Sequence, residues 1–216
     1  MPLVLSNSSI YANGPSAQSG CVGGFFTLPG SQDVFGITNF HVVEKGGIGT
    51  LNAPIFKLGS VAKIGLLEYW YQLDTHNVNY FDMALFAIDK AVATPVWNVA
   101  VGGWADANNA VQVQLTRANG IQTFGIAAGL KNGPFNITLE RQPFQFTNLL
   151  QIHSTSTTVP FSSPGDSGSL IFSGGNIVAL LLGADTNEPF ISYGIPFIDS
   201  INNKGILNYF QLTPMS

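Results

Sequence analysis

Short apolar runs, separated by clusters of glycine, proline, asparagine and serine, recur along the whole chain. The run at residues 24–28 is followed by the turn-forming segment 29–33 and by a second apolar run at 34–40, which is the pattern of a β-hairpin. Because the runs are short and no long helical pattern lies between them, the sequence predicts an all-β barrel or sandwich. The other predicted strands lie at residues 61–67, 83–88, 111–115, 135–139, 149–153, 170–172, 177–182 and 191–195.

One helix is predicted, close to the C-terminus. Asp199 or Ser200 can cap a segment with apolar residues at positions 201, 206, 207 and 210. Gly205 weakens the middle of this segment, because glycine is a poor helix former.

A break in the strand pattern near residues 89–101 suggests where the chain divides. Pro95 and a pair of glycines interrupt the strands at this point. The sequence therefore predicts two barrel-sized halves, an N-terminal barrel over residues 14–97 and a C-terminal barrel with the terminal helix over residues 98–216.

Composition narrows the class of protein. Of 216 residues, 45% are hydrophobic and only 9% are charged, and the formal net charge is −4. This balance leaves no basic face to neutralise several phosphates, so we expect no nucleic-acid partner. The longest apolar stretch, residues 177–182, is too short to span a bilayer, so we expect no membrane partner.

The single cysteine, Cys21, cannot form an intrachain disulfide. Together with an N-terminus that lacks a basic and long apolar leader, this favours a cytoplasmic protein, with export by a route that needs no classical signal peptide as the alternative. We expect Cys21 to be a small buried residue rather than a redox-active thiol.

The segment 163–169, Ser-Pro-Gly-Asp-Ser-Gly-Ser, carries the clearest chemical signal. A nucleophilic serine needs its hydroxyl exposed at a tight turn, with backbone N–H groups directed at the developing oxyanion. Gly165 and Gly168 supply the backbone freedom for such a turn around Ser167. An ordinary Gly/Ser hairpin is the alternative interpretation of this segment.

Two further residues complete a set of three. His41 ends an apolar, strand-like run, and Asp82 opens another, where a partly buried carboxylate would need a partner such as an imidazole N–H. Considered singly, His41 is more simply interpreted as a surface or core residue, and Asp82 could equally be a surface residue at a strand edge. With Ser167 they follow the order His, Asp, Ser, which is the order of the chymotrypsin-type triad.

These segments resemble those of the trypsin-like, chymotrypsin-fold serine peptidases, in particular the disulfide-free bacterial and viral-type members. The resemblance covers roughly residues 20–210 and implies two packed antiparallel β-barrels of the chymotrypsin type with a short C-terminal helix. It implies a serine endopeptidase that acts on a protein or peptide substrate. The similar segments are the histidine motif at 38–43, the aspartate motif at 82–85, the nucleophile motif at 165–169, a hairpin at 119–125 and a closing strand at 193–196.

The resemblance assigns a role to each residue of the set. Ser167 would attack the scissile carbonyl, His41 would take its proton, and Asp82 would orient the imidazole and stabilise its charged form. The backbone N–H groups of Gly165 and Ser167 would form the oxyanion hole. Cys21-Val22-Gly23-Gly24 resembles the new N-terminus of an activated zymogen but lies too close to His41 for that role. Asp166 would then have no terminal ammonium to pair with, so we expect backbone N–H groups or water to satisfy it.

The primary substrate pocket is expected to carry no charge, which predicts an apolar or small side chain at the cleaved bond. His153 is a candidate to reach this pocket, and His76 is expected to be a loop residue. The residues predicted to line the pocket are Phe161, Leu182, Gly183, Ala184 and Tyr193.

Two other functions stay open. One is a catalytically silent protease-fold module that binds peptides, and the other is a viral-type protease that processes its own polyprotein. We expect neither a metal nor an organic cofactor, because the sequence has no Cys/His cluster with zinc spacing and no phosphate-binding loop. The sequence leaves the oligomeric state open.

Overall fold

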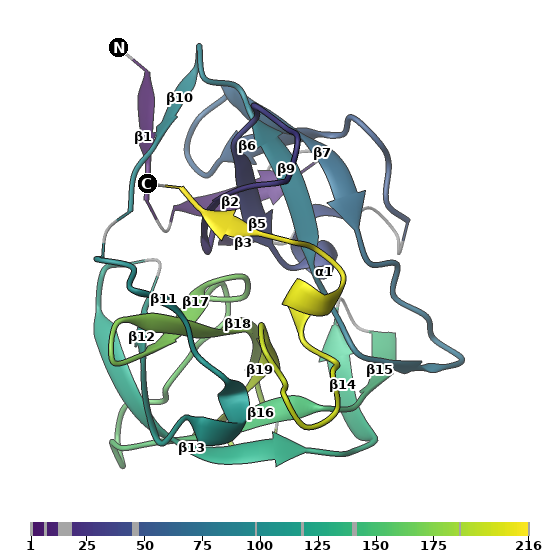
Figure 1. The fold of residues 1–216 in the computed structure, drawn as a ribbon, viewed down its shortest axis with the longest axis vertical. Helices are drawn as coiled ribbons and strands as arrows, with labels where there is room; N and C mark the ends of the chain where they lie inside the picture. Colours follow the sequence, from purple (N-terminus) through teal and green to yellow (C-terminus); the bar gives the residue numbers. More distant parts are fainter. Residues whose placement is uncertain are drawn as a thin grey trace.

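Two β-sheets dominate the computed structural model, which describes residues 2–6, 8–12, 19–44, 48–97, 99–117, 119–139, 142–185 and 187–215. The first sheet has eight strands in the order β20-β4-β5-β9-β7-β6-β2-β3, and the second has seven in the order β11-β18-β17-β12-β13-β16-β19. In the second sheet β18 also pairs with β19, which closes six of its strands into a barrel. Figure 1 shows the first sheet in purple and blue above the second in teal and green.

The strands of the first sheet come almost entirely from the N-terminal half of the chain. Neighbouring strands in it are antiparallel, and no pairing between the described residues of β3 and β20 closes it, so it is a half-barrel. Its strands are β2 (Ser9–Ala12), β3 (Ser19–Cys21), β4 (Gly24–Thr27), β5 (Phe35–Thr38), β6 (Pro54–Lys57), β7 (Lys63–Trp70), β9 (Ala84–Ile88) and β20 (Thr213–Pro214).

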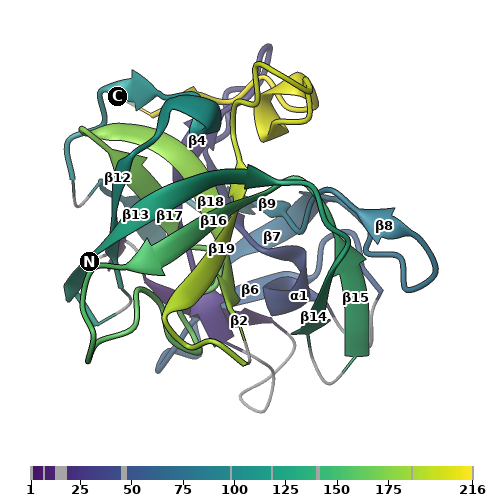
Figure 2. The same ribbon diagram turned by 90° about the horizontal axis from the view of Figure 1, so that it is seen from below.

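The second sheet comes from the C-terminal half of the chain. Its strands are antiparallel except for the short β11, which runs parallel to β18. In Figure 2 the long strands β13, β16 and β19 cross in front of β7 and β9 of the first sheet. Its strands are β11 (Gly103–Trp104), β12 (Gln112–Thr116), β13 (Gln122–Lys131), β16 (Leu149–Ser154), β17 (Leu170–Ser173), β18 (Asn176–Ala184) and β19 (Ile191–Pro196).

Two small sheets and three short helical turns complete the fold. The hairpin of β14 (Phe135–Leu139) and β15 (Gln142–Phe146) pairs with β8 (Val78–Asn79), which joins the second half of the chain to the first. β1 (Leu3–Leu5) pairs with β10 (Ala93–Pro95) in parallel. The helical turns are α1 (Phe40–Val43), η1 (Ala107–Asn109) and η2 (Ile206–Asn208).

Each of the ten predicted strands coincides with an observed strand, although the bounds differ by one to three residues at several ends. The hairpin predicted at 119–125 is the connection between β12 and β13, with Gly120 at φ +82° in its turn. The division of the chain at residues 97 and 98 stays a prediction, because residue 98 lies outside the described part of the chain.

The predicted C-terminal helix is reduced to η2, a single 3₁₀ turn. Residues 201–203 form a turn instead, in which Asn203 adopts a left-handed conformation at φ +54°. Gly205 precedes η2 in an extended conformation at φ −81° and ψ 159°. An extended glycine next to a left-handed asparagine breaks the helical path that the apolar pattern suggested.

Two hydrophobic cores hold the sheets together. The smaller core fills the closed barrel around Phe161, Ile171 and Leu181. The larger core fills the first sheet and continues into the interface, where it includes Leu180 and Leu182 of β18. No helix among the described residues is long and apolar enough to cross a membrane.

Aromatic side chains strengthen the interface between the two sheets. Phe26 of β4 stacks on Trp104 of β11 with 5.6 Å between ring centroids, and Phe197 lies 4.9 Å from the same indole ring. The C-terminal segment returns to the first sheet, where the Trp97 Nε1–H donates to the Met215 carbonyl at 2.8 Å. The interface that positions the candidate site is therefore apolar and closely packed.

Candidate active site

His41 and Asp82 contact one another directly at the interface between the sheets. The Nδ1 atom of His41 is bonded to Oδ2 of Asp82, and the backbone N–H of His41 donates to Asp82 Oδ1 at 3.0 Å. The side chain of His41 is 2% exposed and that of Asp82 is fully buried. One carboxylate therefore holds both the ring and the backbone of His41, which fixes the orientation of the imidazole.

His41 lies in the helical turn α1, not at the end of a strand as the sequence suggested. The strand β5 ends at Thr38, and Asn39 then changes the direction of the chain. The side chain of Asn39 does not cap α1; its Nδ2 donates to the Asp82 carbonyl at 2.7 Å. The turn thus forms around contacts with the Asp82 segment, and these contacts are not visible in the local sequence.

Ser167 lies in the tight turn that the sequence predicted. Gly165 and Gly168 flank it with φ of +92° and +89°, a region that favours glycine. Ser167 is half-buried, and its hydroxyl donates to the Leu182 carbonyl at 3.1 Å. Among the described residues, the backbone N–H groups of Gly165 and Ser167 have no acceptor in the protein, so both are available to a ligand.

The turn around Ser167 packs against the segment that leads to His41. A Cβ atom on Gly168 would lie 2.6 Å from Thr38 Oγ1 and 3.2 Å from the Asn39 nitrogen. A Cβ atom on Gly20 would lie 2.7 Å from the Ser167 carbonyl oxygen and 2.4 Å from Val42 Cγ2. Glycines at these positions allow the two backbones to approach, so the turn around Ser167 lies against the segment that leads to His41.

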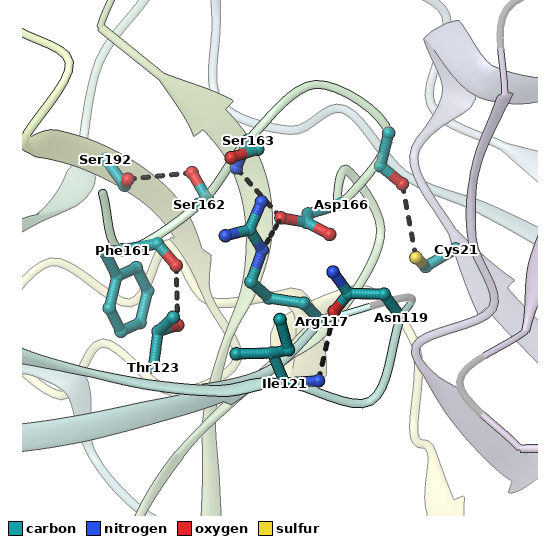
Figure 3. A network of polar contacts seen from close by, with 11 residues as sticks. Cys21, Arg117, Asn119, Ile121, Thr123, Phe161, Ser162, Ser163, Asp166 and Ser192 are labelled. Carbon is teal, nitrogen blue, oxygen red and sulfur yellow. Dashed lines mark hydrogen bonds and ion pairs between the residues drawn. The ribbon is translucent and has the colours of Figure 1, made fainter. Parts of the chain in front are cut away.

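Asp166 is nearly buried, at 4% exposure, and pairs with Arg117. Arg117 Nε donates to Asp166 Oδ2 at 2.8 Å, and the backbone N–H of Ser163 donates to the same oxygen at 2.9 Å (Figure 3). The expected backbone partner is present, and the guanidinium is a second partner that was not predicted from the sequence. The local sequence gives no signal for this partner, because a buried acid can also be satisfied by an imidazole or by amide N–H groups, as Asp82 and Asp199 are.

The residues predicted to line the substrate pocket lie in different environments. Phe161 and Leu182 are fully buried in the two cores. No atom lies within 4 Å of the position that a Cβ on Gly183 would occupy, so the space above it is open. Ala184 and Tyr193 line a cavity of about 280 Å³.

This cavity is more polar than the sequence suggested. Besides Ala184 and Tyr193 it is lined by Pro134, Phe135, Asn136, Ile137, Asp185 and Asn187. The Tyr193 hydroxyl donates to Asp185 Oδ2 at 3.1 Å. Burial, followed by this hydrogen bond and the charges of Asp185 and Glu188, raises the pKa of Tyr193 to about 12. Tyr193 is therefore a neutral hydrogen-bond donor in this cavity.

Neither of the two other histidines lines this cavity. His153 is exposed on β16 and does not line the cavity, and His76 is exposed in a loop, as predicted. Cys21 is fully buried, as predicted. The part of the chain that the structure describes contains no group of three or more His, Cys, Asp or Glu residues placed to hold a metal ion.

Comparison with known proteins identifies the fold. No family model matches the chain, and no curated protein matches its sequence. Among solved structures, the Nocardiopsis protease NAPase superposes with a TM-score of 0.64 at 15% identity, covering 98% of both chains. The chain has the chymotrypsin fold.

Other bacterial proteases of the chymotrypsin fold match equally well. Thermobifida fusca protease A superposes with a TM-score of 0.62 at 17% identity, covering 98% of both chains. Cellulomonas bogoriensis chymotrypsin gives a TM-score of 0.63 at 16% identity, covering 98% of this chain and 97% of the other. The all-β architecture expected from the sequence is thereby confirmed, with the first barrel open and the terminal helix reduced to one turn.

Proposed function

We propose that the protein is a serine endopeptidase with His41, Asp82 and Ser167 as its catalytic triad. The observation that carries the proposal is the buried contact between His41 and Asp82, together with a half-buried serine whose glycine-flanked turn packs against the segment that leads to His41. A histidine whose Nδ1 side is held by a carboxylate presents its other ring nitrogen as a base. The proteases that share the chymotrypsin fold support the same function.

The reaction would proceed through an acyl-enzyme. Ser167 Oγ attacks the scissile carbonyl carbon while His41 Nε2 takes the hydroxyl proton, and Asp82 stabilises the imidazolium that forms. The backbone N–H groups of Gly165 and Ser167 bind the oxyanion of the tetrahedral intermediate. His41 then gives its proton to the leaving amine, and a water molecule repeats the sequence to release the acid.

One local change is required before the first step. The Ser167 hydroxyl is bonded to the Leu182 carbonyl, so it has to rotate about χ1 to donate to His41. Ser167 is half-buried and small, and exposed side chains rotate between staggered positions on the picosecond to nanosecond timescale. This rotation is therefore much faster than any plausible turnover.

The substrate would bind along the edge of β18. The pairing of β17 with β18 ends at Leu170 and Leu180, and the Leu181 backbone is still bonded to Gly168 and Ser169. Among the described residues of β18, Gly183 and Ala184 then have no strand partner on the side of the Ser167 turn. An extended peptide can add to such an edge through main-chain hydrogen bonds. The uncharged residues Gly183 and Ala184 at this edge favour an apolar or small side chain next to the cleaved bond.

The test is labelling of the purified protein with a fluorophosphonate probe. We expect the probe to modify Ser167, so that Ser167→Ala abolishes labelling and His41→Ala strongly reduces it. Ser173→Ala, on the strand after the nucleophile turn, serves as the matched control and should label fully. Cleavage of a peptide library should then show apolar or small residues at the cleaved bond.

Two outcomes would contradict the proposal. Folded protein that stays unlabelled while it binds peptides would show a protease-fold binding module instead. Cleavage dominated by lysine or arginine would leave the enzyme in place and overturn its predicted specificity, with Asp185 in the nearby cavity as the group to test next.

A further inference from the structure

Cys21 of β3 makes two hydrogen bonds to the nucleophile turn, residues 163–169. The backbone N–H of Cys21 donates to the Ser167 carbonyl at 2.7 Å. Its thiol donates to the Gly165 carbonyl, with 3.3 Å between sulfur and oxygen. Figure 3 shows the sulfur of Cys21 directed at the turn, on the opposite side from the pair of Arg117 and Asp166.

The two carbonyls that Cys21 holds alternate with the two N–H groups proposed for the oxyanion hole. The Gly165 N–H belongs to the peptide group 164–165, and the carbonyl bonded to the thiol belongs to the next group, 165–166. The Ser167 N–H belongs to group 166–167, and the carbonyl bonded to the Cys21 N–H belongs to group 167–168. Each donor is therefore adjacent to a peptide plane that Cys21 fixes.

Gly165 is the residue of the turn whose backbone torsion angles are least restrained by its surroundings. Its φ of +92° and the open space around the position of its Cβ leave it free of steric restraint. Glycine visits both halves of φ space at similar cost, so hydrogen bonds to its peptide groups help to select its conformation. The Cys21 thiol is the described side chain that bonds to the Gly165 carbonyl.

The Cys21 thiol is protonated, as a hydrogen-bond donor to the Gly165 carbonyl has to be. Cys21 is fully buried, and burial raises its pKa to about 12. The group is therefore a neutral S–H donor at any pH at which a protease of this type would work. A thiol is a weak donor, so we expect an effect on geometry that is measurable but moderate.

We propose that Cys21 is a positioning residue for the oxyanion hole, and that its thiol holds the Gly165 peptide so that the N–H groups of Gly165 and Ser167 point at the same oxygen. This inference rests on the proposed peptidase function. A cysteine that only fills space in the core would contribute volume and no orientation. The two roles differ in what a replacement does to the transition state.

The experiment compares Cys21→Ser, which keeps a donor, with Cys21→Ala and Cys21→Val, which remove it. Ile55→Val is the matched control, because Ile55 is also fully buried in the first sheet and loses a similar volume. For each variant, kcat and KM are measured on a peptide anilide. Inhibition constants are measured for a peptide aldehyde, which forms a tetrahedral adduct, and for the corresponding alcohol, which does not.

We expect Cys21→Ala and Cys21→Val to lower kcat roughly three- to tenfold, the range for loss of one hydrogen bond. The inhibition constant of the aldehyde should rise by the same factor, while KM and the inhibition constant of the alcohol stay within twofold. Cys21→Ser should restore most of the loss, and Ile55→Val should change none of these constants.

The proposal is overturned if Cys21→Ala keeps the kcat and aldehyde affinity of the unmodified protein, if Cys21→Ser is as impaired as Cys21→Ala, or if the aldehyde and the alcohol weaken equally. These results leave the proposed peptidase function intact. The proposed peptidase function would be contradicted by a different observation: an unmodified protein that neither reacts with the fluorophosphonate nor cleaves peptides. In that case there would be no oxyanion hole for Cys21 to position.

Discussion

Replacing Arg117 with methionine removes the cation beside Asp166 while it keeps much of the length of the side chain. The pair is 14% exposed on the arginine side and 5% on the aspartate side, so solvent screens it little. At 2.8 Å between Nε and Oδ2, Coulomb attraction at an effective dielectric constant of about 20 is about 6 kcal/mol before desolvation. Desolvation of the two ions opposes much of this attraction.

The cost of losing only the arginine is larger than the net value of the pair, because a carboxylate then stays buried without its cation. Broken buried pairs typically cost about 3–5 kcal/mol. Since the Ser163 N–H still donates to Asp166 and Arg117 is partly exposed, we expect the lower end, a loss of about 3 kcal/mol in the free energy of unfolding. Asp166 precedes Ser167 directly, so kcat should fall in the same variant.

Urea denaturation followed by tryptophan fluorescence measures this loss at neutral pH. The matched control is Lys90→Met, because the Lys90 ammonium lies on the exposed surface, bonded to the Gln32 carbonyl. Its removal should change stability by less than about 1 kcal/mol. The double variant Arg117→Met/Asp166→Asn should recover part of the loss, since no charge is then buried alone. A loss below about 1 kcal/mol in Arg117→Met would refute the reasoning that this pair holds the nucleophile turn.

Two further predictions concern stability. Gly168→Ala should cost several kcal/mol more than Gly30→Ala: both glycines have positive φ, +89° and +77°, but only at Gly168 would the added Cβ meet backbone, 2.5 Å from the Cys21 oxygen. Equal losses in urea denaturation would show that the turn can shift away. Burial raises the pKa of the Asp199 carboxyl, but hydrogen bonds from Asn108 and Asn202 lower it by a larger amount. The pKa of Asp199 therefore lies below its usual value of 3.8. The carboxylate then stabilises the fold above about pH 4 and loses this effect as pH falls through the folded-state pKa. Asp199→Asn should therefore lower the free energy of unfolding by about 1–2 kcal/mol at pH 7 and by much less near pH 3. A loss of stability that is the same at both pH values would contradict this role of Asp199.

The sequence by itself determined the strands and the turns that join them. Apolar runs and turn residues act over a few neighbouring positions, so the strand at Phe135–Leu139 could be predicted from local pattern alone. The hairpin around Gly120 was expected from the resemblance to a known family. The nucleophile turn is local in the same sense, because the positive φ at Gly165 and Gly168 follows from glycine itself. β13 was harder to predict, since four of its ten residues are exposed, Phe124 and Ile126 among them, and its apolar alternation is weak.

Tertiary structure decided what surrounds the candidate site. The helical turn at His41, the partnership of Arg117 with Asp166 and the contact of Cys21 with Gly165 each join residues between 41 and 144 positions apart in the chain. Such contacts leave no periodicity in the sequence, because a buried carboxylate or carbonyl requires a donor but does not specify which distant residue supplies it. That choice is made only when the two sheets pack, and this packing places the turn around Ser167 against the segment that leads to His41.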